Sequence, residues 1–287
     1  MASTTPLTLS QFFIQLVPTR LTAFLLGKHM LFLIVISIAL GITFANYRSY
    51  GMGKLFTGIS SFNDIMMRLA NAIILLSPIG IFGLIAQLVV STGIDALIPL
   101  IFYVITAMLG LGIHALIVLP IALKSITGVP PIRLAKHVMP SLLTGFSTAS
   151  SAATLPLLMD DCRKNEKIPT SVTSFVLPLG ITVNMNGTAV FQAIAAIFIA
   201  QIYGIELPLL AMGIISLTTL VAAIGAAAIP SAGLITLTMI LSAVGLPIEG
   251  IGLVFGIDRL IDMLRTTTNL WGNAVSATII THFLGDT

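Results

Sequence analysis

The chain has 287 residues, of which 57% are hydrophobic and only 8% are charged, and its formal net charge is +3. A soluble domain usually carries about 25% charged residues, so this chain has too little polar material to coat a water-soluble globule. The composition therefore indicates an integral membrane protein. It argues against a nucleic-acid-binding protein, because the sequence contains no cluster of basic residues, and the single cysteine, Cys162, excludes an internal disulfide framework.

Five apolar segments are candidates for membrane-spanning helices, which need about 20 mostly apolar residues. In chain order they are Met30–Ala45, Ala70–Val90, Ile94–Leu123, Ser171–Tyr203 and Ile251–Phe283. The first is somewhat short, and the fourth is long enough to span with a tilt. The glycines Gly110 and Gly112 predict a break in the third segment.

Two further apolar regions, Ser141–Met159 and Leu209–Gly245, each contain a cluster of small residues followed by a proline. Irregular backbone is tolerated at membrane depth only where protein buries it or a watery cavity meets it. We therefore predict two re-entrant helical hairpins with unwound tips. A single kinked span is the alternative for each region, although about 37 residues is too long for one span in the second.

Each predicted hairpin precedes a helix with a polar interruption, Asn184–Thr188 in the first case and Asn269–Asn273 in the second. Interrupted apolar segments at corresponding places in two halves of a chain point to the binding site of a transporter. The repeated pattern therefore predicts a binding site formed by these two helices and the hairpin tips.

The distribution of basic residues predicts how the chain is oriented. Six of them flank the first hairpin: Lys124, Arg133, Lys136, Arg163, Lys164 and Lys167. The loops Tyr203–Pro208 and Gly245–Gly250 carry Glu206 and Glu249 but no Lys or Arg. By the positive-inside rule, the first hairpin enters a multi-pass protein from the cytoplasm and the second from outside.

The final helix carries one polar stripe on an otherwise apolar surface, because six polar residues fall on one side of the helical wheel. They are Asp258, Asp262, Arg265, Thr266, Asn269 and Asn273. An ionisable group within a membrane costs about 2.5–3.5 kcal/mol, so such a group usually has a function. The alternative is an internal salt bridge between Asp262 and Arg265 that only holds helices together.

The chemistry of this stripe suits an acidic amino acid. Arg265 offers a planar fork that binds a carboxylate in a bidentate way, and Asp262 can bind an ammonium group. Thr266 and Asn269 can supply further hydrogen bonds. A second carboxylate of the ligand can bind backbone N–H groups at the hairpin tips, where helix N-termini favour anions.

A second group of polar residues, Thr182, Asn184, Asn186 and Thr188, surrounds the first interruption. Carbonyl and amide oxygens at such a break suit a hard cation such as sodium. A kink at Gly187 with local side-chain hydrogen bonds is the alternative. The sequence arranges no nucleophile beside a base and no metal-ligand cluster, so we expect no enzyme and no cofactor.

Four segments closely resemble the glutamate/aspartate and dicarboxylate:cation symporter family. They are STASSAATLP, PLGITVNMNGTAVFQAIAAIFIAQ, AAIGAAAIPSAGL and GIDRLIDMLRTTTNLWGNAV, and they occur in the family's order. The resemblance covers the chain from Gln11 to the C-terminus and is strongest after Ser141.

The resemblance implies an all-α integral membrane protein of the elevator type, with an inverted-repeat transport domain, two re-entrant hairpins and two interrupted transmembrane helices. Residues 1–69 would be a partial scaffold region with the broken fourth span, residues 70–124 the fifth and sixth spans, and residues 125–287 the transport core. Family members are homotrimers, and the resemblance places this chain in the cell (inner) membrane, in contact with the lipid bilayer.

The family's substrate-binding positions correspond to Ser151, Thr188, Ile229, Gly233, Asp262, Arg265, Thr266 and Asn269. Its cation-binding positions correspond to Gly180, Thr182, Asn184, Asn186, Asn269 and Asn273. The implied ligand is a small acidic amino acid or a dicarboxylate, and the implied coupling ion is H+ or Na+.

The sequence departs from the family pattern in three ways. It has no counterpart of the first two spans and most of the third, Asn186 and Asn273 replace cation-binding aspartates, and Gln192 replaces a glutamate linked to proton movement in the neuronal transporters. We therefore expect coupling to protons or to fewer sodium ions. A C4-dicarboxylate symporter is one alternative, against which Asp262 argues, and a truncated, non-transporting membrane protein is another.

Overall fold

The computed structural model describes residues 98–285 except 227, 229 and 230, together with scattered residues between 40 and 90. The apolar segments Met30–Ala45 and Ala70–Val90 lie largely outside the described residues, as does the predicted site residue Ile229. Every regular element from residue 98 onward is a helix, which confirms the all-α prediction for that part of the chain.

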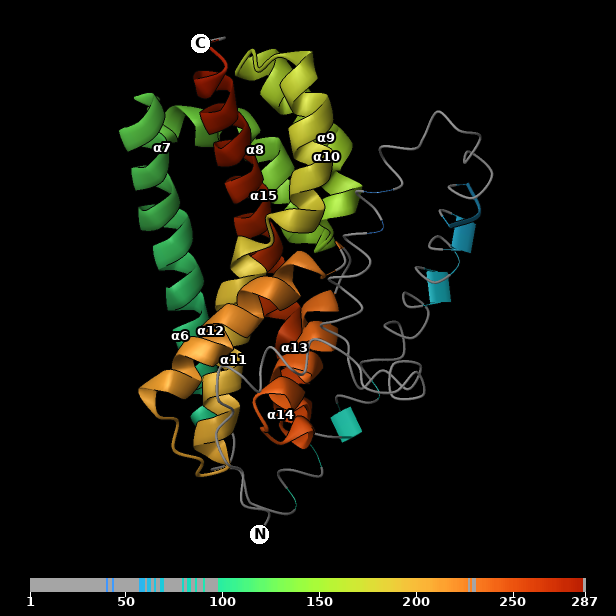
Figure 1. Ribbon diagram of the computed structural model, residues 1–287, viewed down its shortest axis with the longest axis vertical. Coiled ribbons are helices and arrows are strands. Elements are labelled where there is room, and N and C mark those ends of the chain that lie inside the picture. Colours follow the sequence, from blue (N-terminus) through green and yellow to red (C-terminus); the bar gives the residue numbers. More distant parts are fainter. Residues whose placement is uncertain are drawn as a thin grey trace.

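The described elements follow one another as an all-helical bundle (Figure 1). They are α6 (Ile98–Ile113), the π-helical turn η2 (His114–Val118), α7 (Leu119–Thr127), α8 (Pro131–Thr148), α9 (Ser151–Asn165), α10 (Thr170–Val183), α11 (Asn186–Ile202), α12 (Leu209–Ile224), α13 (Ala232–Ala243), the short 3-10 helix η3 (Ile248–Gly250), α14 (Ile251–Phe255) and α15 (Asp258–Phe283).

The first described helix passes through Gly110 and Gly112 without interruption, so the predicted break at these glycines is wrong. Gly110 instead permits a close approach of α6 to α11, because a Cβ atom there would lie 2.6 Å from Cδ1 of Ile194. The irregularity follows as the π-helical turn η2, in which the N–H of Leu119 donates to the carbonyl of His114.

Pro120 gives the physical reason for this turn. Proline has no N–H and its ring displaces the preceding helical carbonyls, so a carbonyl of η2 loses its usual partner. The carbonyl of Ala115 instead accepts a hydrogen bond of 2.9 Å from Nε1 of Trp271 on α15. This contact ties α15 to the junction between α6 and α7.

We expect Trp271→Phe to lower the free energy of unfolding by about 1–3 kcal/mol, because the buried carbonyl of Ala115 would lose its donor. Thermal unfolding of the purified chain in detergent measures the effect. Tyr203→Phe is the control, since it removes a polar group from an exposed side chain. Equal melting temperatures for Trp271→Phe and the wild-type chain would refute the role of this hydrogen bond.

The helices form two hairpins, α8 with α9 and α12 with α13, as the sequence predicts, so the kinked-span alternative is wrong. The first tip is the pair Ala149–Ser150, where Ala149 adopts a left-handed conformation with φ of 52°. The second tip lies between Ile224, the end of α12, and Ala232, the start of α13, and its residue Ser231 has φ of 58°. These tight left-handed turns replace the glycines usually found at such positions.

The two hairpin tips touch each other. The carbonyl of Ala228 in the second tip accepts hydrogen bonds from Oγ of Ser150, at 3.2 Å, and from the N–H of Ala152, at 3.3 Å. An unwound tip leaves backbone groups without helical hydrogen-bond partners. This contact gives a carbonyl of the second tip and an N–H group of the first hairpin a partner in each other. The tips therefore form a common structure in the middle of the molecule.

One predicted interruption is present and the other is wrong. Residues Asn184 and Met185 separate α10 from α11, whereas α15 runs without a break through Asn269–Asn273. The segment Asp258–Phe283 contains no proline, and its Gly272 serves packing, because a Cβ atom there would overlap the amide of Asn186. The preceding turn at Gly256–Ile257 separates α14 from α15.

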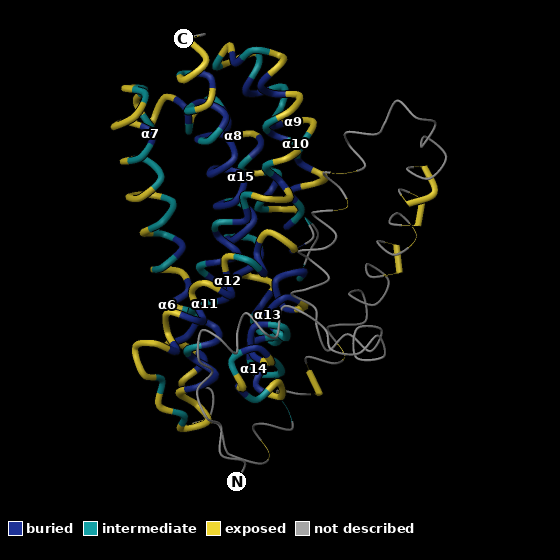
Figure 2. Tube along the Cα trace, viewed as in Figure 1, coloured by how far each residue is buried: buried dark blue, intermediate teal, exposed yellow. Residues whose placement is uncertain are grey.

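Two large apolar clusters hold the helices together, and Figure 2 shows buried residues in dark blue along the packed helices. The first joins α6, α11, α12, α13 and the start of α15, with Phe191, Leu237 and Ile240 fully buried. The second joins α7 to α10 with the later part of α15, around Leu158 and Trp271. Dense packing in these clusters fixes the positions of the helices that carry the polar side chains.

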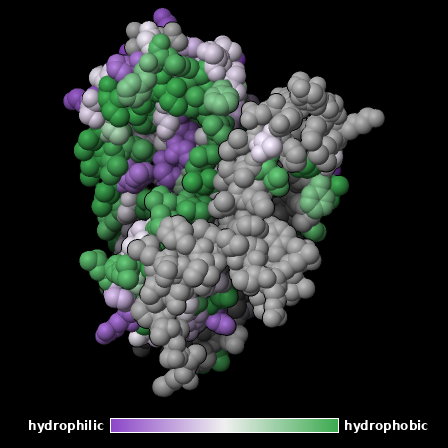
Figure 3. All heavy atoms as spheres, viewed as in Figure 1, coloured by the Kyte–Doolittle hydropathy of each residue, from purple (hydrophilic) through white to green (hydrophobic). Residues whose placement is uncertain are grey.

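The helical segments Ile98–Thr127 (α6, η2 and α7) and Thr170–Ile202 (α10 and α11) are long and apolar enough to cross a membrane. Large hydrophobic side chains of the first point outward, including Ile101, Phe102 and Leu109. Hydrophobic residues cover much of the described surface in Figure 3, including the side formed by α6 and α7. Such an extended apolar surface is typical of contact with lipid or with another apolar partner.

Candidate functional site

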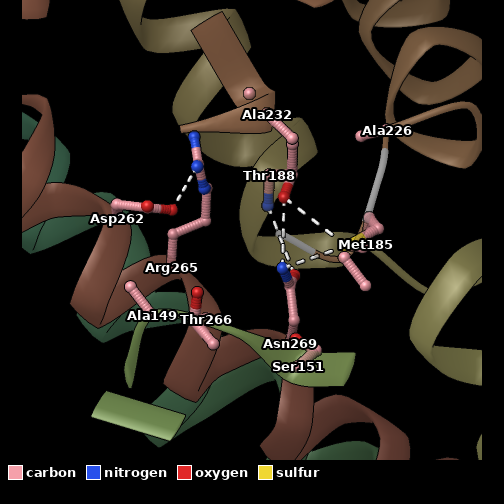
Figure 4. A pocket seen from close by; sticks show the side chains of 12 residues that line it. Ala149, Ser151, Met185, Thr188, Ala226, Ala232, Asp262, Arg265, Thr266 and Asn269 are labelled. Carbon is pink, nitrogen blue, oxygen red and sulfur yellow. Dashed lines mark hydrogen bonds and ion pairs between the residues drawn. The ribbon is translucent and has the colours of Figure 1, made fainter. Parts of the chain in front are cut away.

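A polar pocket lies where the two hairpin tips meet the break between α10 and α11 and one face of α15 (Figure 4). Its lining residues are Ala149, Ser151, Met185, Thr188, Ala226, Ala228, Ala232, Gly233, Asp262, Arg265, Thr266 and Asn269. The first turns of α9, α11 and α13 contribute to this lining. Helix N-termini carry free N–H groups and a partial positive charge, so their meeting favours an anionic ligand.

Arg265 brings the full positive charge into the pocket. Its side chain is only 3% exposed and forms a charge-assisted hydrogen bond with Asp262 through Nη2. The guanidinium carbon lies 4.8 Å from the centre of the Phe191 ring, which is a cation–π distance. Gly233 makes room for it, because a Cβ atom at that position would overlap the guanidinium group.

Asp262 connects α15 to the second hairpin. One of its carboxylate oxygens pairs with Arg265, and the other accepts a hydrogen bond of 2.8 Å from the N–H of Ser231. The ion pair that a purely structural role would require is therefore present. It does not account for Thr266 and Asn269, which continue the stripe along the pocket wall.

Asn269 connects α15 to the first turn of α11. Its Oδ1 accepts hydrogen bonds from the N–H groups of Gly187, at 2.8 Å, and Thr188, at 3.3 Å. Its Nδ2 donates to Oγ1 of Thr188 at 3.1 Å. Met185 completes the group, with its sulfur 3.3 Å from Nδ2 of Asn269 (Figure 4). The α11 terminus is therefore held in place by one side chain.

The pocket is nearly closed in this conformation, with a cavity volume of about 10 Å³. That is about the space of one water molecule, so an amino acid requires the pocket to widen. The side chain of Arg265 and the second tip form its wall beside Asp262 (Figure 4). Movement of the guanidinium group or of that tip would provide the space.

The predicted cation-binding residues lie around the break between α10 and α11, and their side chains make different contacts. Asn184 donates from Nδ2 to Oγ of Ser276 at 3.1 Å, and Asn186 accepts from the N–H of Gly187 at 2.7 Å. Asn273 lies against Gly180, where a Cβ atom would overlap its Oδ1. Thr182 is exposed and its hydroxyl bonds to the carbonyl of Leu179, so its side chain lies apart from this group.

Asn273 stands out among these residues. Its side chain is 1% exposed, and neither its Oδ1 nor its Nδ2 has a hydrogen-bond partner within the described part of the chain. A buried amide without partners is costly unless a bound group satisfies it. The unpartnered Oδ1 of Asn273 is an amide oxygen of the kind that hard cations use as a ligand.

The structure thus brings together seven of the predicted substrate-binding residues: Ser151, Thr188, Gly233, Asp262, Arg265, Thr266 and Asn269. Ile229 is outside the described residues. The prediction missed Met185, which lies within the polar break, and the alanines of the two tips. It also missed Phe191 beneath the guanidinium group. The small apolar residues of the tips carry no chemical signal in the sequence. Met185 could have been found, because it lies between the two asparagines of the predicted break.

The chain is similar to known membrane transporters. Residues 2–283 match the model of the sodium:dicarboxylate symporter family. Excitatory amino acid transporter 1 of Homo sapiens is 40% identical over 258 residues, which cover 89% of this chain and 47% of the relative. An excitatory amino acid transporter of Caenorhabditis elegans is 38% identical over 261 residues, with 90% and 51% covered.

A third relative, an excitatory amino acid transporter of Onchocerca volvulus, is 38% identical over 261 residues, which cover 90% of this chain and 52% of the relative. The chain therefore spans about half the length of the curated relatives that it matches.

Proposed function

The chain belongs to the sodium:dicarboxylate symporter family, and on that premise we propose that it is a secondary active symporter of glutamate or aspartate. The observation that carries this proposal is the buried pair of Arg265 and Asp262 at the meeting point of helices α9, α11 and α13. A buried guanidinium group beside helix N-termini selects an anion with more than one carboxylate.

The groups of an acidic amino acid match those of the pocket. Its side-chain carboxylate would bind the fork of Arg265, and its ammonium group would bind Asp262. Its α-carboxylate would bind N–H groups at the helix termini of the tips. Binding would exchange the Arg265–Asp262 pair for two ion pairs with the ligand, so neither residue would be left as an unpaired buried charge.

A C4-dicarboxylate is a poorer ligand by the same reasoning. It has no ammonium group, so Asp262 would lose Arg265 to the ligand and gain no cation in return. A buried carboxylate without a partner is strongly unfavourable. The excitatory amino acid transporters among the relatives favour the acidic amino acid as well.

We propose that the chain spans the cell (inner) membrane several times, with the loop between α9 and α10 in the cytoplasm. The segments that carry most of the basic residues in the described part of the chain, and the C-terminus, lie at one end of the molecule (Figure 1). The α11–α12 loop, with Glu206, lies at the opposite end. Residues 125–287 would form the moving transport core of a homotrimer, and residues 1–69 and 70–124 would belong to the preceding spans.

The proposed function is tested by uptake of labelled aspartate into proteoliposomes that contain the purified chain. A pH gradient and a sodium gradient are imposed separately. We expect accumulation with the pH gradient, competition by unlabelled glutamate and none by leucine. Failure of labelled aspartate to bind the purified chain would contradict the proposal, and uptake driven by sodium alone would contradict proton coupling.

The sodium dependence of aspartate binding tests whether Asn273 contributes to a cation site. Replacing this asparagine with aspartate restores a negative charge beside Gly180, and the charge of the ligands strongly determines cation affinity. We expect Asn273→Asp to lower the sodium concentration for half-maximal aspartate binding by about tenfold or more, which is about 1.4 kcal/mol. Asn165→Asp is the control, since it adds the same charge at an exposed position. An unchanged sodium dependence would argue against a cation site at Asn273.

A further inference from the structure

A second carboxylate, Asp258, lies behind the binding site and takes no part in the proposed substrate contacts. It is the first residue of α15 and is 2% exposed. Neither of its oxygens has a hydrogen-bond partner among the described residues. The nearest charged nitrogen that pairs with it is Nη1 of Arg265, at 4.0 Å, and that nitrogen also has no hydrogen-bond partner there. A buried carboxylate in this situation is poorly stabilised as an anion.

Only one buried cation lies near Asp258 in the described part of the chain, and a second buried carboxylate shares it. On α15 it faces Asp262 and Arg265, and Arg259 is nearby but exposed. From α6 it faces the buried Tyr103, whose hydroxyl has no hydrogen-bond partner in the described structure, and Ser231 lies close to it from the second tip. Two carboxylates therefore share one buried guanidinium group.

Binding of an acidic amino acid would change this balance. If the ligand carboxylate occupies the fork of Arg265 and the ligand ammonium group binds Asp262, Asp258 retains only a share of a guanidinium that is already paired. The ligand also adds a net negative charge to the cluster. Because like charges in a buried site disfavour one another, one carboxylate would become neutral by binding a proton.

We propose that Asp258 binds one proton from solution when the acidic substrate binds, and that this proton is the one transported with the substrate. An O–H bond forms on the carboxylate of Asp258 and no other covalent bond changes. This inference rests on the proposed function, and it deepens it by naming the residue that carries the coupling ion.

Among the buried acids of the described chain, Asp258 differs in that neither of its oxygens accepts a hydrogen bond and its one ion pair, with Arg265, is long. Asp262 accepts from Ser231 and would exchange Arg265 for the ligand ammonium. Asp161 accepts two hydrogen bonds from Ser141, and the carboxylate of Glu166 pairs with His137 at 2.6 Å. Gln192 cannot titrate, although it lies in the same region and donates to the carbonyl of Gly233.

The experiment measures proton uptake when aspartate binds to the purified full chain in weakly buffered detergent solution with a pH indicator. The dissociation constant of aspartate is measured over a series of pH values. We expect the wild-type chain to take up close to one proton for each aspartate bound. The affinity of the chain for aspartate should weaken by about tenfold for each unit of pH above the pH at which Asp258 titrates.

Asp258→Asn should bind aspartate with an affinity that no longer depends on pH and without proton uptake. In proteoliposomes it should exchange external for internal aspartate but not accumulate aspartate in response to a pH gradient. Asp258→Glu should recover proton uptake. Asp160→Asn is the matched control, because the side chain of Asp160 is 45% exposed and pairs with Lys164 on the same helix.

Aspartate binding by the wild-type chain without proton uptake would overturn this inference and leave the proposed function intact. Full proton uptake by Asp258→Asn would overturn it as well. No aspartate binding by the wild-type chain would overturn the proposed function and this inference together. The wild-type measurement decides the question even if Asp258→Asn does not fold.

Discussion

Replacing Arg265 with alanine is expected to weaken aspartate binding by at least about 100-fold and to abolish uptake. Removing one partner of a buried, hydrogen-bonded charge pair typically costs about 2–5 kcal/mol of binding energy, and about 1.4 kcal/mol corresponds to a factor of ten. Arg265 is the buried cation of the pocket, so the pocket has no equivalent group to replace it within the described residues. Binding of labelled aspartate to the purified variant measures the loss.

Three further variants separate this effect from misfolding. Arg265→Ala also leaves Asp262 and Asp258 without their buried cation, which we expect to destabilise the fold by about 3–5 kcal/mol. The double variant Arg265→Ala with Asp258→Asn should recover part of the melting temperature but none of the aspartate binding. Arg265→Lys keeps the charge without the bidentate fork and should bind with intermediate affinity.

Arg163→Ala, which removes an arginine that pairs with Asp160 near the surface, serves as the control for a general loss of positive charge. It should leave aspartate binding unchanged. Aspartate binding by Arg265→Ala within about threefold of wild type, well below the factor of ten that corresponds to about 1.4 kcal/mol, would show that the ligand does not bind this guanidinium group.

The Gly187→Ala variant is expected to lower both the melting temperature and aspartate binding. An added Cβ atom would lie 2.8 Å from the backbone carbonyl of Arg265 and 3.0 Å from Cβ of Thr268, so α11 and α15 would have to separate. Overpacking of this kind costs about 1–3 kcal/mol. Separation would also break the hydrogen bonds from the first turn of α11 to Asn269.

The matched control is Gly213→Ala on α12, where an added Cβ atom meets open space. Alanine is the better helix former, so this variant should be at least as stable as the wild-type chain, by up to about 1 kcal/mol. Thermal unfolding and aspartate binding are measured for both variants side by side. If Gly187→Ala behaves like Gly213→Ala, the close approach of α11 to α15 is not required.

Local patterns in the sequence predicted much of this architecture. The small-residue clusters in Ser141–Met159 and Leu209–Gly245 predicted two hairpins, because irregular backbone at membrane depth is tolerated only where protein buries it or a watery cavity meets it. The asparagines at 184 and 186 predicted a helix break, and the spacing of the polar residues from Asp258 to Asn273 predicted one buried face. Each of these signals depends on residues within a few helical turns of one another.

The errors also have local causes. The sequence around Asn269–Asn273 resembles that of the first break, but α15 continues through it, because the glycine there makes room for Asn186 rather than interrupting the helix. The glycines of α6 likewise serve packing, and the irregularity lies next to Pro120. A glycine has the same appearance in sequence whether it provides space or ends a helix.

The sequence by itself determined that the chain is apolar and helical, that it has two hairpins, and which side chains of α15 share a face. Only the tertiary structure decided that the tips meet at Ala228, that Phe191 lies beneath Arg265, and that Asp258 is buried without a hydrogen-bond partner. The physical reason is distance along the chain. Helical periodicity arises from neighbouring residues, whereas the pairing and solvation of a buried charge depend on segments that only folding brings together.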